Sequence, residues 1–205
     1  GRHQRATDSG IRGGRKAGMN IRFDILDTPL SGVRILQRKP IGDSRGYLER
    51  LFCSEELQML APGKHIAQIN HTLTASRGAV RGMHFQRPPH AEIKFVSCLR
   101  GEVFDVAVDL RHNSPTFLCW HAELLSAGNH KTLVIPEGFA HGFQTLTDDC
   151  EMLYFHTAAY QQGAEGGLNP QDPRLAIQWP LRVSGLSPRD AAHPLLDDDF
   201  GGITQ

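Results

Sequence analysis

The chain has 205 residues, and its 22 basic and 22 acidic side chains give a formal charge of zero at neutral pH. Nucleic acid and anionic membranes attract proteins with a basic excess, so neither is an expected partner. Hydrophobic residues make up 40% of the sequence, enough for a sizeable core. No apolar run approaches the about 18 residues that a membrane-spanning helix needs. The composition therefore predicts one globular domain with at most short extensions.

The first 18 residues differ in texture from the rest of the chain. They hold five glycines, four arginines and almost no large apolar side chain, and Met19 follows them directly. Such a segment cannot bury enough surface to offset the entropy lost on ordering. We expect residues 1–18 to be a disordered extension or an artificial remnant, and residues 19–205 to form a single domain.

From about residue 30 to residue 160 the sequence has the pattern of β-strands. Residues 103–110 alternate with a period of two, which indicates a strand with one face in the core. Many short strands at roughly ten-residue spacing predict an all-β sandwich or jelly roll. Strands separated by turn signals are expected at 33–38, 66–74, 80–85, 93–99, 103–110, 118–125, 132–135, 142–147 and 150–157.

Helices are expected only as short peripheral pieces. One is predicted at 54–60, where Ser54 is suited to cap the N-terminus and Glu55 and Glu56 fall in the first turn. Beyond residue 160, proline and glycine become frequent and the strand pattern fades. We expect residues 161–205 to form loops and short helices that pack on the barrel and cover its mouth.

The four cysteines, at positions 53, 98, 119 and 150, are widely scattered and form no Cys-x-x-Cys pair. This spacing is typical neither of a disulfide framework nor of a zinc knuckle. We therefore expect reduced thiols in a cytoplasmic protein.

Two of the eleven histidines stand in segments that resemble the two halves of the cupin signature. The first half is met by Gly78 and His84, and the second by Pro136, Gly138 and His141. A carboxamide, Gln86, replaces the second histidine of the first half, and it is a poor ligand for transition metals. We therefore expect a barrel pocket without a metal site. A metal-dependent enzyme that uses His84, Gln86 and His141 remains the alternative.

An ordered set of motifs carries a more specific resemblance, over about residues 35–194. The chain resembles the dTDP-4-dehydrorhamnose 3,5-epimerases, a family of metal-free cupins. The motifs are Asp43-Ser-Arg-Gly46, Gln68-Ile-Asn70, Arg81-Gly-Met-His-Phe-Gln86, Lys94, Gly101 to Arg111, Ser114-Pro-Thr-Phe117, Ile135 to Phe143, Tyr154, Asp172-Pro173, Trp179-Pro180 and Leu186-Ser-Pro-Arg-Asp190.

The resemblance implies a fold and a reaction. The fold is a cupin jelly-roll barrel, or double-stranded β-helix, with short peripheral helices, and no cofactor is implied. The substrate is a nucleoside-diphosphate 4-keto-6-deoxy sugar, most simply a dTDP sugar. The reaction inverts C3, C5 or both through an enolate, which needs a base, an acid on the opposite face and a group that stabilises the oxyanion.

The resemblance also implies roles for individual residues. His84 is the base, Asp190 orients it, Tyr154 is the acid and Lys94 lies near the oxyanion. A homodimer is implied, in which Arg45 reaches the neighbouring subunit's site. The substrate-binding positions are Arg45, Gln68, Asn70, Arg81, His141, Tyr160, Glu165 and Arg189.

Two departures from the family pattern leave the identity of the base and the sugar open. Leu48 stands where the family has an aromatic residue, and Arg50 where it has an acidic one. The segment Asn169-Pro-Gln171 also lacks an aromatic residue that is often found before Asp-Pro. A non-catalytic module that binds sugar nucleotides is a second alternative, which the pairing of His84 with Tyr154 disfavours.

Overall fold

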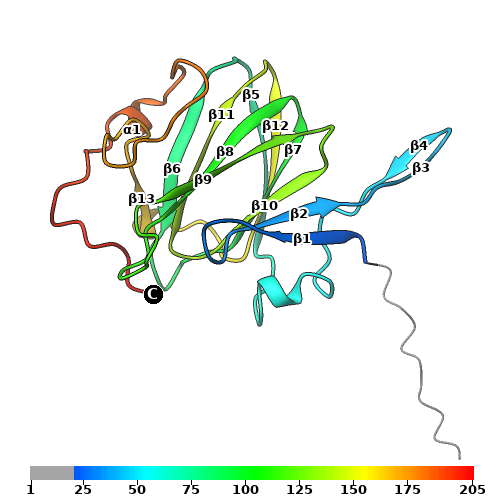
Figure 1. Cartoon of the computed structure of the whole chain (residues 1–205), viewed down its shortest axis with the longest axis horizontal. Helices are drawn as coiled ribbons and strands as arrows, with labels where there is room; N and C mark the ends of the chain where they lie inside the picture. The colour runs from blue at the N-terminus through cyan, green and yellow to red at the C-terminus, as the bar shows by residue number, and fades with distance from the viewer. Residues whose placement is uncertain (1–20) are drawn as a thin grey trace, which may run out of the picture.

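The computed structural model describes residues 21–205, in which two antiparallel β-sheets pack face to face (Figure 1). The extension expected at residues 1–18 lies outside the described residues. Across residues 21–205, no helix is long and apolar enough to cross a membrane.

The larger sheet has six strands in the order β1-β2-β10-β7-β12-β5, and the smaller has five in the order β13-β6-β11-β8-β9. The fold class predicted from the sequence, an all-β cupin-like jelly roll, is confirmed. The strands of the larger sheet are β1 (Phe23–Asp27), β2 (Arg34–Arg38), β5 (Gln68–Thr74), β7 (Lys94–Arg100), β10 (Lys131–Ile135) and β12 (Cys150–His156). Those of the smaller sheet are β6 (Val80–Gln86), β8 (Glu102–Asp109), β9 (Trp120–Ser126), β11 (Phe139–Thr145) and β13 (Glu165–Gly167).

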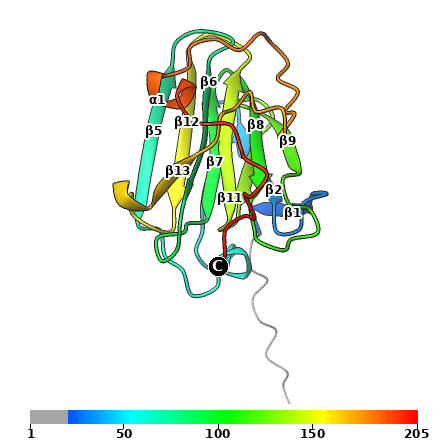
Figure 2. The same ribbon diagram turned by 90° about the vertical axis from the view of Figure 1, so that its left-hand side faces the viewer.

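The sequence predicts one buried face for residues 103–110, but the structure buries both faces of this strand. On β8, Val103 and Ala107 pack into the core between the two sheets. Val106 and Val108, on the other face, belong to a second cluster that includes Leu175 and Ile203 from the C-terminal segment. This segment therefore packs on the outer face of the smaller sheet, and its residues 185–190 also line the cavity described below. Figure 2 shows it running along that side of the molecule.

The outer face of the larger sheet is covered in the same manner by the segment after residue 50. Leu57 and Ala61 pack there against Phe95 and Val134. The helix predicted at 54–60 is wrong, because these residues form turns and a single 3₁₀ turn, η1 (Gln58–Leu60). Seven residues make a marginal helix, and here the burial of Leu57 on the sheet decides the local backbone instead.

Short elements also lie outside the two packed sheets. The hairpin β3 (Ile41–Asp43) and β4 (Gly46–Leu48) projects from the body, as Figure 1 shows at the right. The one α-helix among the described residues, α1 (Pro188–Ala191), is capped by Ser187, whose side chain accepts a hydrogen bond from the Asp190 amide. A further 3₁₀ turn, η2 (Gln162–Ala164), precedes β13.

Candidate active site

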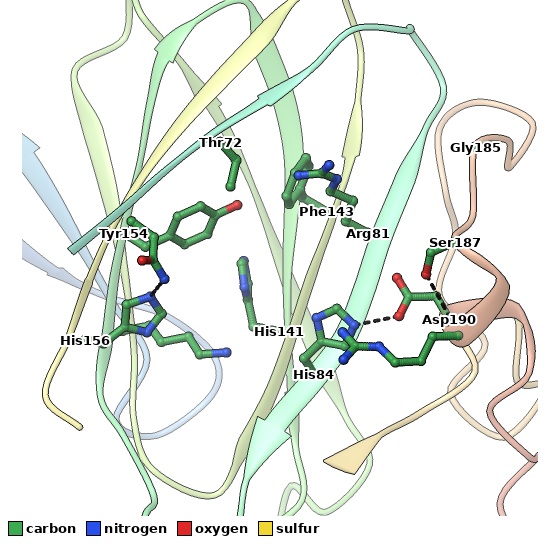
Figure 3. A pocket seen from close by; sticks show the side chains of 13 residues that line it. Thr72, Arg81, His84, His141, Phe143, Tyr154, His156, Gly185, Ser187 and Asp190 are labelled. Atoms are coloured by element: carbon green, nitrogen blue, oxygen red, sulfur yellow. Dashed lines mark hydrogen bonds and ion pairs between the residues drawn. The ribbon is translucent and has the colours of Figure 1, made fainter. Parts of the chain in front are cut away.

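A cavity of about 450 Å³ opens between the two sheets at the end where α1 lies (Figure 3). Polar and titratable side chains predominate in its walls. The lining residues are Asn70, Thr72, Arg81, His84, Lys94, His141, Phe143, Tyr154, His156, Gly185, Ser187, Arg189 and Asp190. All four residues that the sequence predicted as catalytic are therefore in one cavity, together with four of the eight predicted binding residues.

One wall carries a histidine–aspartate pair. His84 on β6 places Nε2 2.6 Å from Oδ1 of Asp190, which α1 holds at the edge of the cavity. The other carboxylate oxygen of Asp190 accepts a hydrogen bond from the Gly82 amide at 3.1 Å. Burial alone would raise the pKa of Asp190, but the hydrogen bonds from His84 and Gly82 outweigh it and lower that pKa. Asp190 is therefore charged at neutral pH and fixes the orientation of the His84 ring.

A β-bulge explains why Arg81 and His84 both line the cavity. Residues three apart on a regular strand point to opposite faces of the sheet. Here the register shifts, because His141 pairs with His84 whereas Phe143 pairs with Arg81. The extra residue on β6 restores both side chains to the same face, which is how bulges commonly serve active sites.

The backbones at the bulge approach so closely that only glycine fits on either strand. A Cβ on Gly82 would lie 2.6 Å from the Cα of Gly142. A Cβ on Gly142 would lie 2.5 Å from Sδ of Met83 and 2.7 Å from the carbonyl oxygen of Arg81. These glycines, each beside a site residue in the sequence, thus let the two strands that carry His84 and His141 pair.

The opposite wall belongs to the larger sheet and carries Tyr154 on β12 (Figure 3). Only 9% of this residue is exposed. Burial raises the pKa of the Tyr154 phenol above its ordinary value, so the hydroxyl keeps its proton at neutral pH. The cavity is thus flanked by a histidine on one sheet and a protonated phenol on the other.

His141 lies deep in the cavity, on β11. Its Nε2 is 2.8 Å from Oδ1 of Asp105, a fully buried residue of the neighbouring strand β8. Burial lowers the pKa of His141, and the attraction of Asp105 only partly opposes this. The imidazole ring also meets Tyr154 edge to face, with 6.1 Å between the ring centroids.

Lys94 is held by a short chain of polar contacts. Its Nζ lies 3.5 Å from Oε1 of Glu92, whose Oε2 is 3.0 Å from Nδ1 of His156. The other ring nitrogen of His156 lies 3.3 Å from the side-chain amide of Asn70. Burial would raise the pKa of Glu92, but the contacts with His156 and Lys94 lower it, so a carboxylate balances the buried ammonium group.

Of the four remaining predicted binding residues, three lie together beside the main cavity. Gln68, Tyr160 and Glu165 line a smaller cavity of about 180 Å³, which shares His84 and Lys94 with the larger one. Arg189 links the two cavities, because it lines the larger one and its guanidinium lies 3.0 Å from Glu165 in the smaller one. Tyr160 donates a hydrogen bond to the same carboxylate at 2.7 Å.

Arg45 is not brought to the cavity of its own chain. It lies in the β3–β4 hairpin turn with 88% of its side chain exposed, paired with Asp43. The structure also adds residues that the sequence reasoning missed, among them Thr72, Phe143, Glu92 and His156. Strand period would have found three of them, because Thr72, Phe143 and His156 each lie two residues after a predicted site residue.

The donor set proposed for a cupin metal does not come together. The amide nitrogen of Gln86 donates to the carbonyl oxygens of His90 and Ala159, and its oxygen accepts from the Gln161 amide. A side chain that is bonded to the backbone in this way is not available as a metal ligand. Its contacts instead fix the position of the loop before η2.

Comparisons with known proteins point to one family of epimerases over most of the chain. Residues 27–198 match the family model described as dTDP-4-dehydrorhamnose 3,5-epimerase. A relative of that name from Salmonella typhimurium is 43% identical over 175 residues, which cover 84% of this chain and 95% of that protein. A dTDP-4-dehydrorhamnose 3-epimerase from Streptomyces niveus is 36% identical and covers 78% of each chain.

A solved structure gives the same answer in three dimensions. It is a dTDP-6-deoxy-D-glucose-3,5-epimerase from Legionella pneumophila Philadelphia 1, in complex with dTDP-4-keto-L-rhamnose. The two structures superimpose with a TM-score of 0.82 at 37% identity, covering 89% of this chain and 99% of that chain. The chain therefore belongs to the dTDP-4-dehydrorhamnose 3,5-epimerase family and is an enzyme of the isomerase class.

Proposed function

We propose that the protein inverts C3 and C5 of a dTDP-4-keto-6-deoxy sugar, with His84 as base and Tyr154 as acid. The observation that carries this proposal is the position of these two side chains on facing sheets, across one cavity. Inversion requires a proton to leave one face of the sugar and another to arrive on the other face. The ligand of the Legionella pneumophila relative, dTDP-4-keto-L-rhamnose, supports the class of substrate.

In the first step, His84 takes the proton from the carbon next to the ketone. Its Nε2 is engaged with Asp190, so Nδ1 is the nitrogen that accepts the proton. Asp190 then stabilises the imidazolium that forms, as the carboxylate of a catalytic triad does. Because Asp190 is charged at neutral pH, this stabilisation is in place before the reaction begins.

In the second step, the enolate is stabilised and protonated again. Lys94 supplies the positive charge for the oxygen at C4, and the buried His141 lines the same region of the cavity. Tyr154 then donates its phenolic proton to the opposite face of the carbon. Arg81 and Arg189 add cationic groups suited to the pyrophosphate of the nucleotide.

The number of carbons inverted is the finer part of the proposal. Relatives named 3,5-epimerase and 3-epimerase both match this chain, at 43% and 36% identity. We favour action at both carbons, because the family model and the relative from Salmonella typhimurium carry the 3,5-epimerase description.

We further propose that the protein works as a homodimer in the cytoplasm. The β3–β4 hairpin exposes Ile41, Tyr47 and Leu48 to solvent in the single chain, an apolar surface suited to a second copy. A partner docked there would bring Arg45 near a second cavity. The four free thiols fit a reducing compartment.

Deuterium incorporation tests the proposed reaction. The protein is incubated in D₂O with dTDP-4-keto-6-deoxyglucose, and the C3 and C5 protons are followed by NMR. We expect wild-type protein to exchange both protons, His84→Ala to exchange neither, and the distant variant His121→Ala to behave as wild type. Tight binding of the nucleotide sugar without exchange would instead support a binding module, and exchange by His84→Ala would remove His84 as the base.

A further inference from the structure

A third titratable residue adjoins the His84–Asp190 pair. His193 follows α1, and its Nε2 lies 3.7 Å from Oδ1 of Asp190, the oxygen that also contacts His84. That nitrogen is buried and has no hydrogen-bond partner among the described residues. The rings of His84 and His193 meet edge to face, with 6.4 Å between their centroids. A buried imidazole nitrogen without a partner is unusual, because such groups are normally satisfied.

The three side chains form a donor set that suits a transition metal. One ligand atom from each of His84, Asp190 and His193 lies within 4.8 Å of the others. Two imidazoles and a carboxylate are a common ligand set for Zn²⁺, which leaves the fourth tetrahedral position for water. Ligand atoms of a tetrahedral zinc ion are about 3.4 Å apart, given bonds of about 2.0–2.1 Å. Small side-chain rotations would reach that spacing from the one observed.

We propose that His84, Asp190 and His193 form an inhibitory binding site for Zn²⁺ or a similar divalent transition-metal ion. This donor set shares only His84 with the cupin metal position, since it replaces Gln86 and His141 with Asp190 and His193. The metal would take the place of the hydrogen bond between His84 and Asp190, with the third ligand supplied by His193.

The chemistry of the imidazole explains why such a metal inhibits. In the metal-free protein, Nε2 of His84 faces Asp190 and Nδ1 is left to accept the substrate proton. Bonding of Zn²⁺ to Nε2 moves the single proton of the neutral ring to Nδ1. His84 then has no lone pair left for the substrate. The metal also neutralises Asp190, which removes the support for an imidazolium.

The local charges limit the affinity of the site. Asp190 is the only carboxylate in the cluster, and the nearby guanidinium of Arg189 is paired with Glu165. The His193 side chain retains 19% exposure, and its ring lies against Gly167. These features are those of a reversible regulatory site rather than a structural one.

Binding is measured first, without substrate. The full-length protein competes with a chromophoric chelator for Zn²⁺, and Co²⁺ is used as a spectroscopic probe of tetrahedral coordination. We expect one site per chain, with an affinity reduced about tenfold or more in His193→Ala and in the bulkier His193→Gln. His121→Ala is the matched control, because His121 also contacts a carboxylate, Glu123 at 3.1 Å, but outside the cavity.

Inhibition is measured second, and this arm rests on the proposed epimerase activity. We expect Zn²⁺ to stop deuterium exchange by the wild type, EDTA to restore it, and His193→Ala to remain active at the same Zn²⁺ concentration. Equal Zn²⁺ affinity in the wild type and in both His193 variants would overturn the site. Absence of exchange without metal would instead reject the proposed function and leave the binding result standing.

Discussion

At the scale of single residues, two side chains of the site are each held in a defined protonation state. Asp190 is held in its charged form by His84 and the Gly82 amide, because these contacts outweigh burial and lower its pKa. Tyr154 is held in its neutral form, because burial raises its pKa. A charged orienting group and a neutral acid on facing walls are what an epimerase that works through an enolate needs.

The first prediction concerns the charge of Asp190. We expect Asp190→Asn to lower kcat by about 10²- to 10⁴-fold at neutral pH, because the amide cannot stabilise the imidazolium of His84. The substrate affinity should change far less, since Asp190 acts through His84. Rates and KM from the exchange assay check this. A variant with normal kcat and raised KM would assign Asp190 to binding.

The same carboxylate predicts a dependence of stability on pH. A lowered pKa in the folded state stabilises the protein above the unfolded value of about 3.9, and this contribution is lost as the pH falls through the folded value. Urea denaturation gives the free energy of unfolding of the wild type and of Asp190→Asn. The difference between the two should be largest at pH 7 and shrink below about pH 4. A pH-independent difference between the two proteins would contradict the contribution of this charge.

The third residue-scale prediction separates proton removal from inversion. We expect Tyr154→Phe to keep deuterium exchange but to lose most of the inverted product, because His84 can return a deuteron to the face from which it took the proton. The phenyl ring keeps the packing against His141. NMR of the sugar protons distinguishes the two outcomes. Unchanged product formation would exclude the phenol as the acid.

At the scale of elements, the pairing of β6 with β11 determines the geometry of the site. The bulge at this pairing turns both Arg81 and His84 into the cavity. It depends on the close approach of Gly82 and Gly142. A change at this point should therefore affect catalysis although neither glycine carries a chemical group.

Gly142→Ala tests this dependence. The added methyl group meets Met83 and the Arg81 carbonyl, so we expect a loss of about 1–3 kcal/mol in the free energy of unfolding and reduced exchange activity. Gly128→Ala is the control, because nothing lies within 4 Å of its new methyl group. Urea denaturation and the exchange assay are compared for both. Equal stability and equal exchange activity of the two variants would mean that β6 and β11 can move apart without harm to the site.

The same elements show how far the sequence alone predicts this structure. Strands with a clear pattern, such as β8 and β12, were predicted near their observed positions. The strands β1, β3, β4 and β13 were missed; β3, β4 and β13 have three residues each, which give too little periodicity. His84, Tyr154 and Asp190, which stand in family motifs, were predicted as site residues, whereas Glu92 and His193 were not. Their contacts depend on loops whose course no local pattern encodes.

At the scale of the whole molecule, the β3–β4 hairpin extends away from the body of the two sheets (Figure 1). Its tip carries Arg45, with 88% of the side chain exposed, and its strands expose Tyr47 and Leu48. An exposed apolar hairpin is a poor surface for a monomer and a suitable one for a partner subunit. We therefore expect Leu48→Asp to shift the protein toward monomers, as measured by light scattering.

The last prediction asks whose cavity Arg45 serves. If Arg45 contributes to the partner's site, Arg45→Ala should be weakly active alone and His84→Ala inactive, yet a mixture of the two should recover activity. A mixed dimer then has one cavity with an intact His84 from its own chain and an intact Arg45 from the other. If Arg45 serves its own chain, each cavity of the mixed dimer lacks one group and no activity returns. The mixture is made by co-expression with two affinity tags, and the doubly tagged dimer is assayed for deuterium exchange. Recovery toward half of the wild-type rate supports the shared site, and a rate no higher than the mean of the two parent variants contradicts it.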